Sequence, residues 1–285
     1  MYFLIVLQQL IGAGSQIFAK SVTDSVNPYS VLFVRGVIAT VVYIAFLALH
    51  RPQSWKIDRR DLPKLALLAL LNVPVNQLVF LIGINMTTAQ NSALAYSLAP
   101  VFVLLISYIF YREKATALKI VGIVVALVGT TIIFTEHGID FSSSYFVGNL
   151  LVLAAAIAWS VYAAVGKEFS LKYGATYSNA LAMIAGYLLY FPIYAFMPVS
   201  FDPAAVSVLD WSKLLYLGLL TSCGSYMILY IVVKKMSPTK VAVFNNVQPV
   251  LTAIFAVLIL GSTLSPVFIV GGMIAIAGVV MTQLG

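Results

Sequence analysis

Long apolar stretches alternate with short polar segments along the whole chain. A helix that crosses a bilayer needs about 20 mostly apolar residues, and ten stretches of this sequence meet that requirement. They lie at residues 2–20, 29–49, 64–84, 92–111, 116–135, 148–167, 177–197, 213–233, 240–260 and 266–284. The segments between them are rich in charged residues, proline and glycine, which are typical of turns. The pattern predicts an all-α integral membrane protein with ten transmembrane helices.

The composition indicates that lipid, rather than water, surrounds most of this chain. Hydrophobic residues make up 62% of the 285 positions and charged residues 9%, whereas a typical soluble domain carries about 25% charged residues. The net charge of +7 would suit a nucleic-acid-binding protein, but the basic residues are dispersed in short gaps between apolar stretches. We therefore expect the lipid bilayer as a partner, and no nucleic acid.

Basic residues gather in the loops on one side of the predicted bundle. The loops on the side of the N-terminus contain Arg51, Lys56, Arg59, Arg60, Lys64, Arg112, Lys114, Lys119, Lys167, Lys172, Lys234, Lys235 and Lys240. The loops on the other side contain Lys20 and Lys213. Because positively charged loops stay in the cytoplasm, this asymmetry predicts a multi-pass protein of a bacterial-type inner (plasma) membrane with both termini cytoplasmic.

The two halves of the sequence resemble each other. A shift of 149 residues places prolines and glycines of the first half on the same residue types in the second: Pro100 on Pro249, Gly122 on Gly271 and Gly129 on Gly278. Each half would hold five helices, so the second half must enter the membrane from the opposite side, as in inverted-repeat transporters. We predict an N-terminal five-helix repeat over residues 1–138 and an inverted five-helix repeat over residues 139–285.

Several short motifs follow one another in an order that is typical of a known family. They are Pro100 within the fourth predicted helix, Arg112-Glu113 at the next turn, Gly122 and Gly129 in the fifth helix, and Gly148-Asn149 followed by Trp159 and Tyr162 in the sixth. With these motifs the chain resembles the EamA family of the drug/metabolite transporter (DMT) superfamily over essentially its whole length. The resemblance implies a metabolite or amino-acid exporter with a central cavity.

Polar and aromatic side chains inside the predicted helices are the candidates for substrate binding. Amides are costly to bury in hydrocarbon without a partner, so they face another helix or a wet cavity. We select seven as cavity residues that would bind a small zwitterion or neutral polar metabolite: Asn76, Gln77, Tyr96, Trp159, Tyr162, Asn245 and Asn246. Hydrogen bonding between helices is the alternative for each of them.

Two prolines and one arginine add further candidates. Pro100 and Pro249 each remove a helical hydrogen bond, so they are either hinges between the moving halves or static kinks. Arg35 is a charged residue well inside a predicted helix. It either binds a substrate carboxylate or phosphate, or it snorkels outward or pairs with a backbone carbonyl or Asp24.

Residues for catalysis or metal binding are missing from the predicted membrane segments. All nine acidic residues fall in or beside loops, His50 and His137 lie at loop edges, and Cys223 is the single cysteine. Intramembrane catalysis needs a base, a metal site or a nucleophile pair, so we expect no enzyme activity, cofactor or metal. The lack of a mid-helix carboxylate also disfavours proton-coupled export of cationic drugs.

These features predict a carrier of a small-molecule substrate. We expect it to act as a monomer by alternating access and to export or exchange a small polar metabolite, most readily an amino acid or similar zwitterion. Two alternatives stay open: a uniporter or channel-like facilitator, and an organic-anion carrier that uses Arg35.

Overall fold

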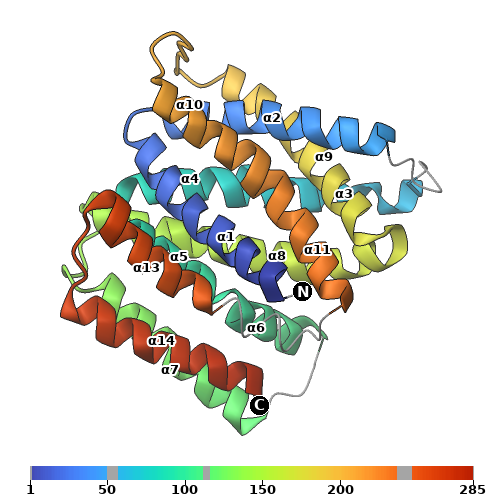
Figure 1. The fold of residues 1–285 in the computed structure, drawn as a ribbon. Helices are drawn as coiled ribbons and strands as arrows, with labels where there is room; N and C mark the ends of the chain where they lie inside the picture. The colour runs from blue at the N-terminus through green and yellow to red at the C-terminus, as the bar shows by residue number, and fades with distance from the viewer. Residues whose placement is uncertain (1, 50–56, 112–115, 236–245, 285) are drawn as a thin grey trace.

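A computed structural model describes residues 2–49, 57–111, 116–235 and 246–284, and within these ranges every regular element is a helix (Figure 1). Eight helices are long and apolar enough to cross a membrane: Tyr2–Thr23, Pro28–Leu49, Arg59–Met86, Ala89–Ile106, Ala117–Phe134, Ser144–Tyr173, Ala175–Ala195 and Pro266–Leu284. The prediction of an all-α fold is therefore confirmed for the described residues, with eight candidate membrane helices. The count of ten and the inverted repeat stay predictions.

The first half of the chain folds into a series of helices. They are α1 (Tyr2–Thr23), α2 (Pro28–Leu49), η1 (Arg59–Asp61), α3 (Leu62–Leu70), η2 (Leu71–Gln77), α4 (Leu78–Met86), α5 (Ala89–Ser97), α6 (Ala99–Tyr111) and α7 (Ala117–Phe134). Of these, η1, α3, η2 and α4 follow one another without a gap and make one long helix. Side-chain caps set two of the starts, since the hydroxyls of Thr88 and Thr116 accept hydrogen bonds from the backbone N–H groups of Asn91 and Lys119.

The second half is built in the same way. Its elements are α8 (Ser144–Tyr173), α9 (Ala175–Ala195), α10 (Val208–Leu215), η3 (Tyr216–Ser225), α11 (Tyr226–Lys235), α13 (Val247–Leu260) and α14 (Pro266–Leu284). Glycines in left-handed or related conformations end two of them, Gly174 after α8 (φ 86°) and Gly261 after α13 (φ 64°). Elements α10, η3 and α11 follow one another without a gap and make one long helix.

Two of the long helices change their winding in the middle. Segments η2 and η3 are π-helical, and η2 contains Pro74, which has no N–H to donate to the helix. The wider turn moves polar side chains such as Asn76 and Ser222 onto the inner face, where both are buried. π-Helical segments in other proteins are frequent at functional sites for this reason.

The fourth predicted helix is interrupted next to its proline. Element α5 ends at Ser97 and α6 begins at Ala99, with Leu98 between them and Pro100 in the first turn of α6. In the second half, α13 begins at Val247, two residues before Pro249. Both prolines therefore lie in the first turn of a helix, where the missing N–H leaves no helical bond unmade. The expectation that each proline removes a helical hydrogen bond is wrong in this structure.

Helices α7 and α14 form a tightly packed pair at one edge of the bundle (Figure 1). Glycines on both helices let the backbones touch: a Cβ placed on Gly122 would lie 2.8 Å from the carbonyl oxygen of Gly278, and one on Gly271 would lie 2.9 Å from that of Gly129. Small residues are the usual means of close helix contact in a membrane.

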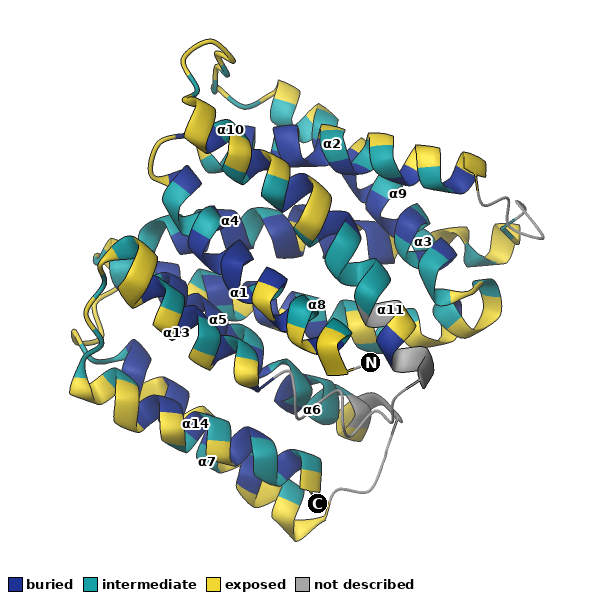
Figure 2. Cartoon of the chain, viewed as in Figure 1, coloured by how far each residue is buried: buried dark blue, intermediate teal, exposed yellow. Residues whose placement is uncertain are grey.

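The remaining helices pack around α1 and α8. Helix α1 contacts α13, η3 and α11, while α8 contacts α5, α6, η2 and α4. Helix α2 contacts α9 and η3, and α9 contacts α3 and η2. Buried positions line the inward faces of these helices, whereas exposed positions lie on the outer faces (Figure 2).

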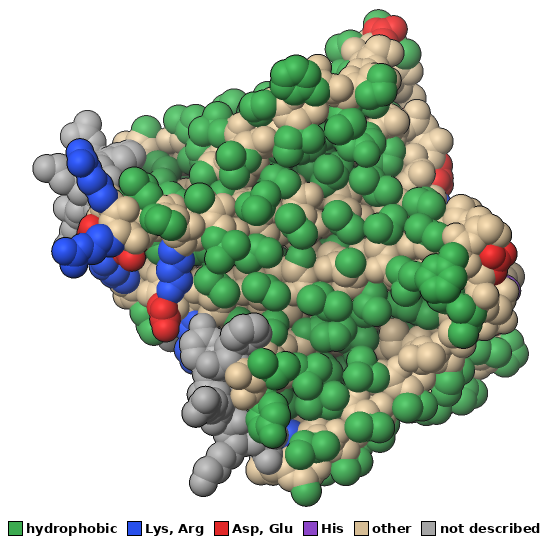
Figure 3. Space-filling model, turned by 180° about the vertical axis from the view of Figure 1, so that it is seen from behind, with side chains coloured by type: hydrophobic (Ala, Val, Ile, Leu, Met, Phe, Trp, Pro, Cys, Tyr) green, Lys and Arg blue, Asp and Glu red, His purple; other side chains and the backbone are tan. Residues whose placement is uncertain are grey.

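The surface of the molecule is mostly apolar. On the face in Figure 3, hydrophobic side chains cover the broad middle in a band. Lysine and arginine side chains gather at one end together with some acidic ones, and further acidic side chains lie at the opposite end. Large hydrophobic residues such as Val41 and Leu258 are exposed elsewhere in the sequence as well. The band is what a lipid-facing surface requires.

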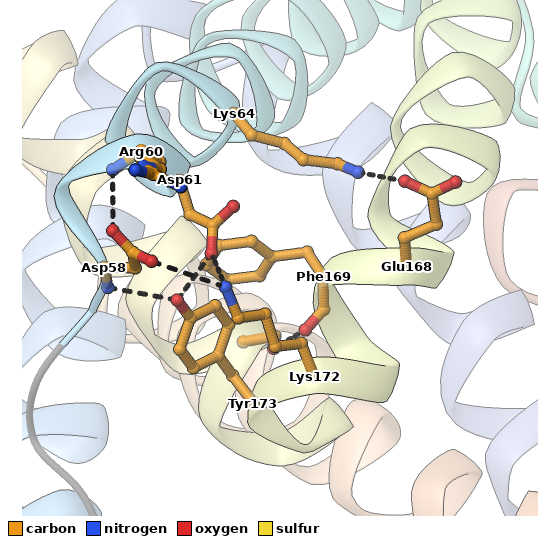
Figure 4. A network of polar contacts seen from close by, with 9 residues as sticks. Asp58, Arg60, Asp61, Lys64, Glu168, Phe169, Lys172 and Tyr173 are labelled. Atoms are coloured by element: carbon orange, nitrogen blue, oxygen red, sulfur yellow. Dashed lines mark hydrogen bonds and ion pairs between the residues drawn. The ribbon is translucent and has the colours of Figure 1, made fainter.

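A polar network joins η1 and the start of α3 to the end of α8 (Figure 4). The Lys64 ammonium lies 2.6 Å from a carboxylate oxygen of Glu168. The Asp61 carboxylate lies 2.5 Å from the Lys172 ammonium and accepts a hydrogen bond of 2.6 Å from the Tyr173 hydroxyl. Because one partner of each pair is exposed and the other is half-buried, solvent screens the charges, and each ion pair contributes about 1 kcal/mol or less to stability.

Candidate functional site

A central cavity of about 410 Å³ lies among helices from both halves of the chain. Its wall is formed by side chains from α1, α2, η2, α4, α5, α6, α8, η3, α11 and α13. The predicted site residues that line it are Arg35, Asn76, Gln77, Tyr96, Trp159 and Asn246, together with Pro100 and Pro249. Asn245 lies outside the described residues. The cavity thus joins candidates that are up to about 210 positions apart in the sequence.

Asn76 is held in place by two hydrogen bonds that leave one of its atoms available. Its amide nitrogen donates to the Tyr96 hydroxyl at 2.6 Å and to the backbone carbonyl of Ala155 at 2.7 Å. Both amide hydrogens are then used, and the carbonyl oxygen has no partner among the described residues. The Tyr96 ring rests edge-on against Phe80, with centroids 5.6 Å apart. This corner of the cavity presents one hydrogen-bond acceptor and one hydroxyl.

Two other predicted amides bond mainly to neighbouring helices. The carbonyl oxygen of Gln77 accepts a hydrogen bond of 2.9 Å from the Tyr187 hydroxyl on α9. The amide nitrogen of Asn246 donates to the side chain of Gln283 at 3.2 Å. Both residues line the cavity, and each also forms a hydrogen bond with the side chain of another helix. Hydrogen bonding between helices is the alternative to substrate binding for these residues.

Aromatic rings cover one side of the cavity. Trp159 lies against Tyr226, with ring centroids 5.8 Å apart, and against Tyr162, with centroids 5.3 Å apart. Tyr162 itself lies behind Trp159 and lines a separate, smaller pocket of about 120 Å³. Its hydroxyl donates to the side chain of Asn179 at 3.2 Å. Tyr162 therefore supports the cavity wall rather than lining it.

Arg35 is buried on the cavity wall, with only 5% of its surface exposed. Its Nε donates a hydrogen bond of 2.7 Å to the hydroxyl of Ser222. Asp24 pairs instead with Lys20 at 3.1 Å. In this structure Arg35 therefore neither snorkels outward nor pairs with Asp24.

Sequence reasoning left out several residues of the wall, among them Thr221, Ser225 and Tyr226. The repeat itself could have found them. The shift of 149 residues that relates the two prolines also places Asn72 on Thr221, Asn76 on Ser225 and Gln77 on Tyr226. Applying that shift to the third helix would have selected the eighth helix as the opposite wall.

The chain resembles proteins of archaea and bacteria over most of its length. It is 30% identical to an "Uncharacterized transporter" of Archaeoglobus fulgidus, in an alignment that covers 99% of this chain and 96% of that protein. It is 28% identical to a "Probable terminal-alkyne amino-acid exporter" of Streptantibioticus cattleyicolor, with coverage of 86% and 79%.

A protein of known crystal structure has the same fold. It superposes with a TM-score of 0.68 and 19% sequence identity, over 99% of this chain and 96% of that one. The family model described as "EamA-like transporter family" matches residues 1–135 and 146–284. As its motifs predicted, the chain belongs to the EamA-like transporter family.

Proposed function

We propose that this protein is a carrier that moves a small polar metabolite across the membrane by alternating access, most readily an amino acid or similar zwitterion. The observation that supports this most directly is the central cavity, which combines an apolar lining with a few polar groups from both halves of the chain. Its volume of about 410 Å³ lies at the lower end of the range of small-molecule sites, about 300–1,000 Å³.

Alternating access requires two halves that can move against each other, and the packing is compatible with inverted repeats. Helix α1 contacts η3 and α13 in the second half, and α8 contacts η2 and α5 in the first half, so the two helices play matching parts. The π-helical segments η2 and η3 also correspond under the repeat shift. We propose ten transmembrane helices in halves 1–138 and 139–285, with Pro100 and Pro249 as hinges.

The distribution of charge on the surface supports a proposed orientation in the membrane. The basic end in Figure 3 would face the cytoplasm, and we propose that both termini lie there, in the plasma membrane of a bacterial-type cell. We further propose that the monomer is functional, because one chain supplies both walls of the cavity, and that it carries a solute rather than catalysing a reaction. The orientation can be tested by placing single cysteines at loop ends of a Cys223→Ser variant and labelling them in intact cells.

Transport itself is tested in proteoliposomes. We expect saturable uptake of an amino acid and accelerated uptake when the vesicles are preloaded with the same unlabelled solute. Linear uptake without counterflow would contradict a carrier and favour the channel-like facilitator. Among the described residues that line the cavity none is acidic, so we expect transport to follow the solute gradient. Strong dependence on an imposed pH gradient would contradict that coupling.

A further inference from the structure

Arg35 carries a positive charge that no protein carboxylate balances within the described part of the chain. The five ion pairs there join lysines to aspartates or glutamates, and none includes Arg35. A charged side chain inside a membrane protein is costly to bury unless it has a partner, and it usually marks a substrate or ion pathway. The partner of Arg35 is therefore to be sought in the cavity.

The guanidinium is anchored on one side only. Its Nε bonds to the Ser222 hydroxyl, which in turn donates to the carbonyl of Leu217 at 3.0 Å. The carbonyl of Ser222 accepts a hydrogen bond of 2.5 Å from Tyr43. The two terminal NH₂ groups have no partner among the described residues, which leaves four of the five N–H donors for a ligand. Such a pair of nitrogens suits the two oxygens of a carboxylate.

Two more buried polar atoms on the same wall have no partner among the described residues. They are Oε1 of Gln16 and the hydroxyl of Thr221, the residue next to Ser222. Buried polar groups are nearly always hydrogen-bonded, and a polar ligand beside Arg35 would offer partners to these two atoms. The hydroxyl can donate to an anion, and the amide oxygen can accept from an ammonium or hydroxyl group.

We infer that Arg35 forms a subsite for the carboxylate of the transported solute. This inference rests on the proposed carrier function and narrows its substrate class to solutes that carry a carboxylate. A cation would meet the charge of Arg35 with no acidic side chain among the described lining residues to offset it. The ammonium of a zwitterion is tolerated, because the lining also includes the carbonyl oxygen of Asn76 and the ring of Trp159, and both groups can attract a cation.

The test uses matched probes that share a side chain and differ in charge. One set is leucine, 4-methylpentanoate, leucinamide and 3-methylbutylamine, and equivalent sets are built on alanine and phenylalanine. Binding to the purified, full-length protein is measured by calorimetry. We expect the carboxylates of at least one set to bind about 10- to 100-fold more tightly than the amide and the amine, the range supplied by a charge-assisted hydrogen bond.

Variants then assign the preference to Arg35. R35Q should lose most of the affinity for carboxylates and leave leucinamide binding within about threefold, while R35K should retain part of the preference because it keeps the charge. R60Q, at an exposed position in η1, is the matched control and should behave as wild type. Equal affinity for carboxylate and amide in the wild type, no carboxylate binding in any set, or unchanged carboxylate binding in R35Q would each overturn the subsite.

Counterflow separates the subsite from the carrier function on which it rests. If carboxylates bind through Arg35 but none exchanges across proteoliposomes, the carrier function fails and the subsite stands. If amides and amines exchange as well as carboxylates, the carrier function stands and the subsite fails. The wild-type binding series decides the question even if R35Q does not fold.

Discussion

Replacing Asn76 by alanine should separate a binding role from a packing role. The substitution removes the hydrogen bonds of 2.6 Å to Tyr96 and 2.7 Å to Ala155. Bonds between membrane helices contribute on average about 0.6 kcal/mol each, so the loss of stability should be about 1 kcal/mol. A protein with a stability of about 5 kcal/mol or more stays almost entirely folded after that loss.

Substrate affinity should fall much further than the folded fraction. Asn76→Ala also removes the carbonyl oxygen that has no partner among the described residues, and it frees the Tyr96 hydroxyl from its partner. Together these changes should weaken substrate binding by about 1–2 kcal/mol, which raises the KM of counterflow about 5- to 30-fold. Tyr96→Phe removes one hydroxyl and keeps the ring on Phe80, so it should give a smaller rise.

The assay is the KM of counterflow in proteoliposomes, compared with the thermal unfolding temperature of the same preparation. Thr130→Ala is the control, because this buried threonine on α7 bonds within its own helix, to the carbonyl of Ala126 at 3.0 Å. It should alter unfolding slightly and leave KM unchanged. If Asn76→Ala lowered the unfolding temperature but kept the wild-type KM, Asn76 would be a packing residue and the reasoning would be refuted.

Three further predictions concern the scaffold. Gly271→Ala should destabilise the protein by about 1–3 kcal/mol, because the new Cβ would press on Ile133 and on the backbone of α7. Gly272→Ala is the control and should be neutral in thermal unfolding, because a Cβ there meets open space. Equal effects of the two substitutions would contradict the close packing. Lys172→Met removes an ion pair whose lysine is 53% exposed, so unfolding should change by less than about 1 kcal/mol, and a larger loss would show that the network in Figure 4 is structural. Pro100→Ala should slow turnover while leaving substrate binding unchanged if the proline is a hinge, and unchanged turnover would indicate a static kink.

Helix positions follow closely from the apolar pattern, because bilayer thickness sets their length. The seventh apolar stretch was expected at residues 177–197 and forms α9, Ala175–Ala195. The eighth was expected from residue 213, yet the helix begins at Val208. The predicted start is too late because the prediction treats charged residues as a sign of a loop. Lys213 and Asp210 form an ion pair of 2.7 Å within the helix, so the helix can include both of them.

The internal geometry of the site depends on contacts that local sequence does not encode. Ser222 bonds to Arg35 across 187 positions of the chain, and no periodicity relates the two residues. Tyr162 follows Trp159 by three positions, and such residues share one face of a helix, so the spacing could not show that Tyr162 contacts the tryptophan without lining the cavity. The π-helical winding of η2 likewise changes which side chains point inward, and an apolar pattern cannot register it.

The glycine-lined contact between α7 and α14 also has a consequence for how the protein is made. Helix α7 ends at Phe134 and its partner is complete only at Leu284. At roughly 5–20 residues per second of synthesis, the intervening 150 positions take roughly 8 to 30 seconds. Until α14 has been synthesised, the glycine face of α7 lacks this partner. Assembly of this edge of the bundle is therefore among the last steps of folding.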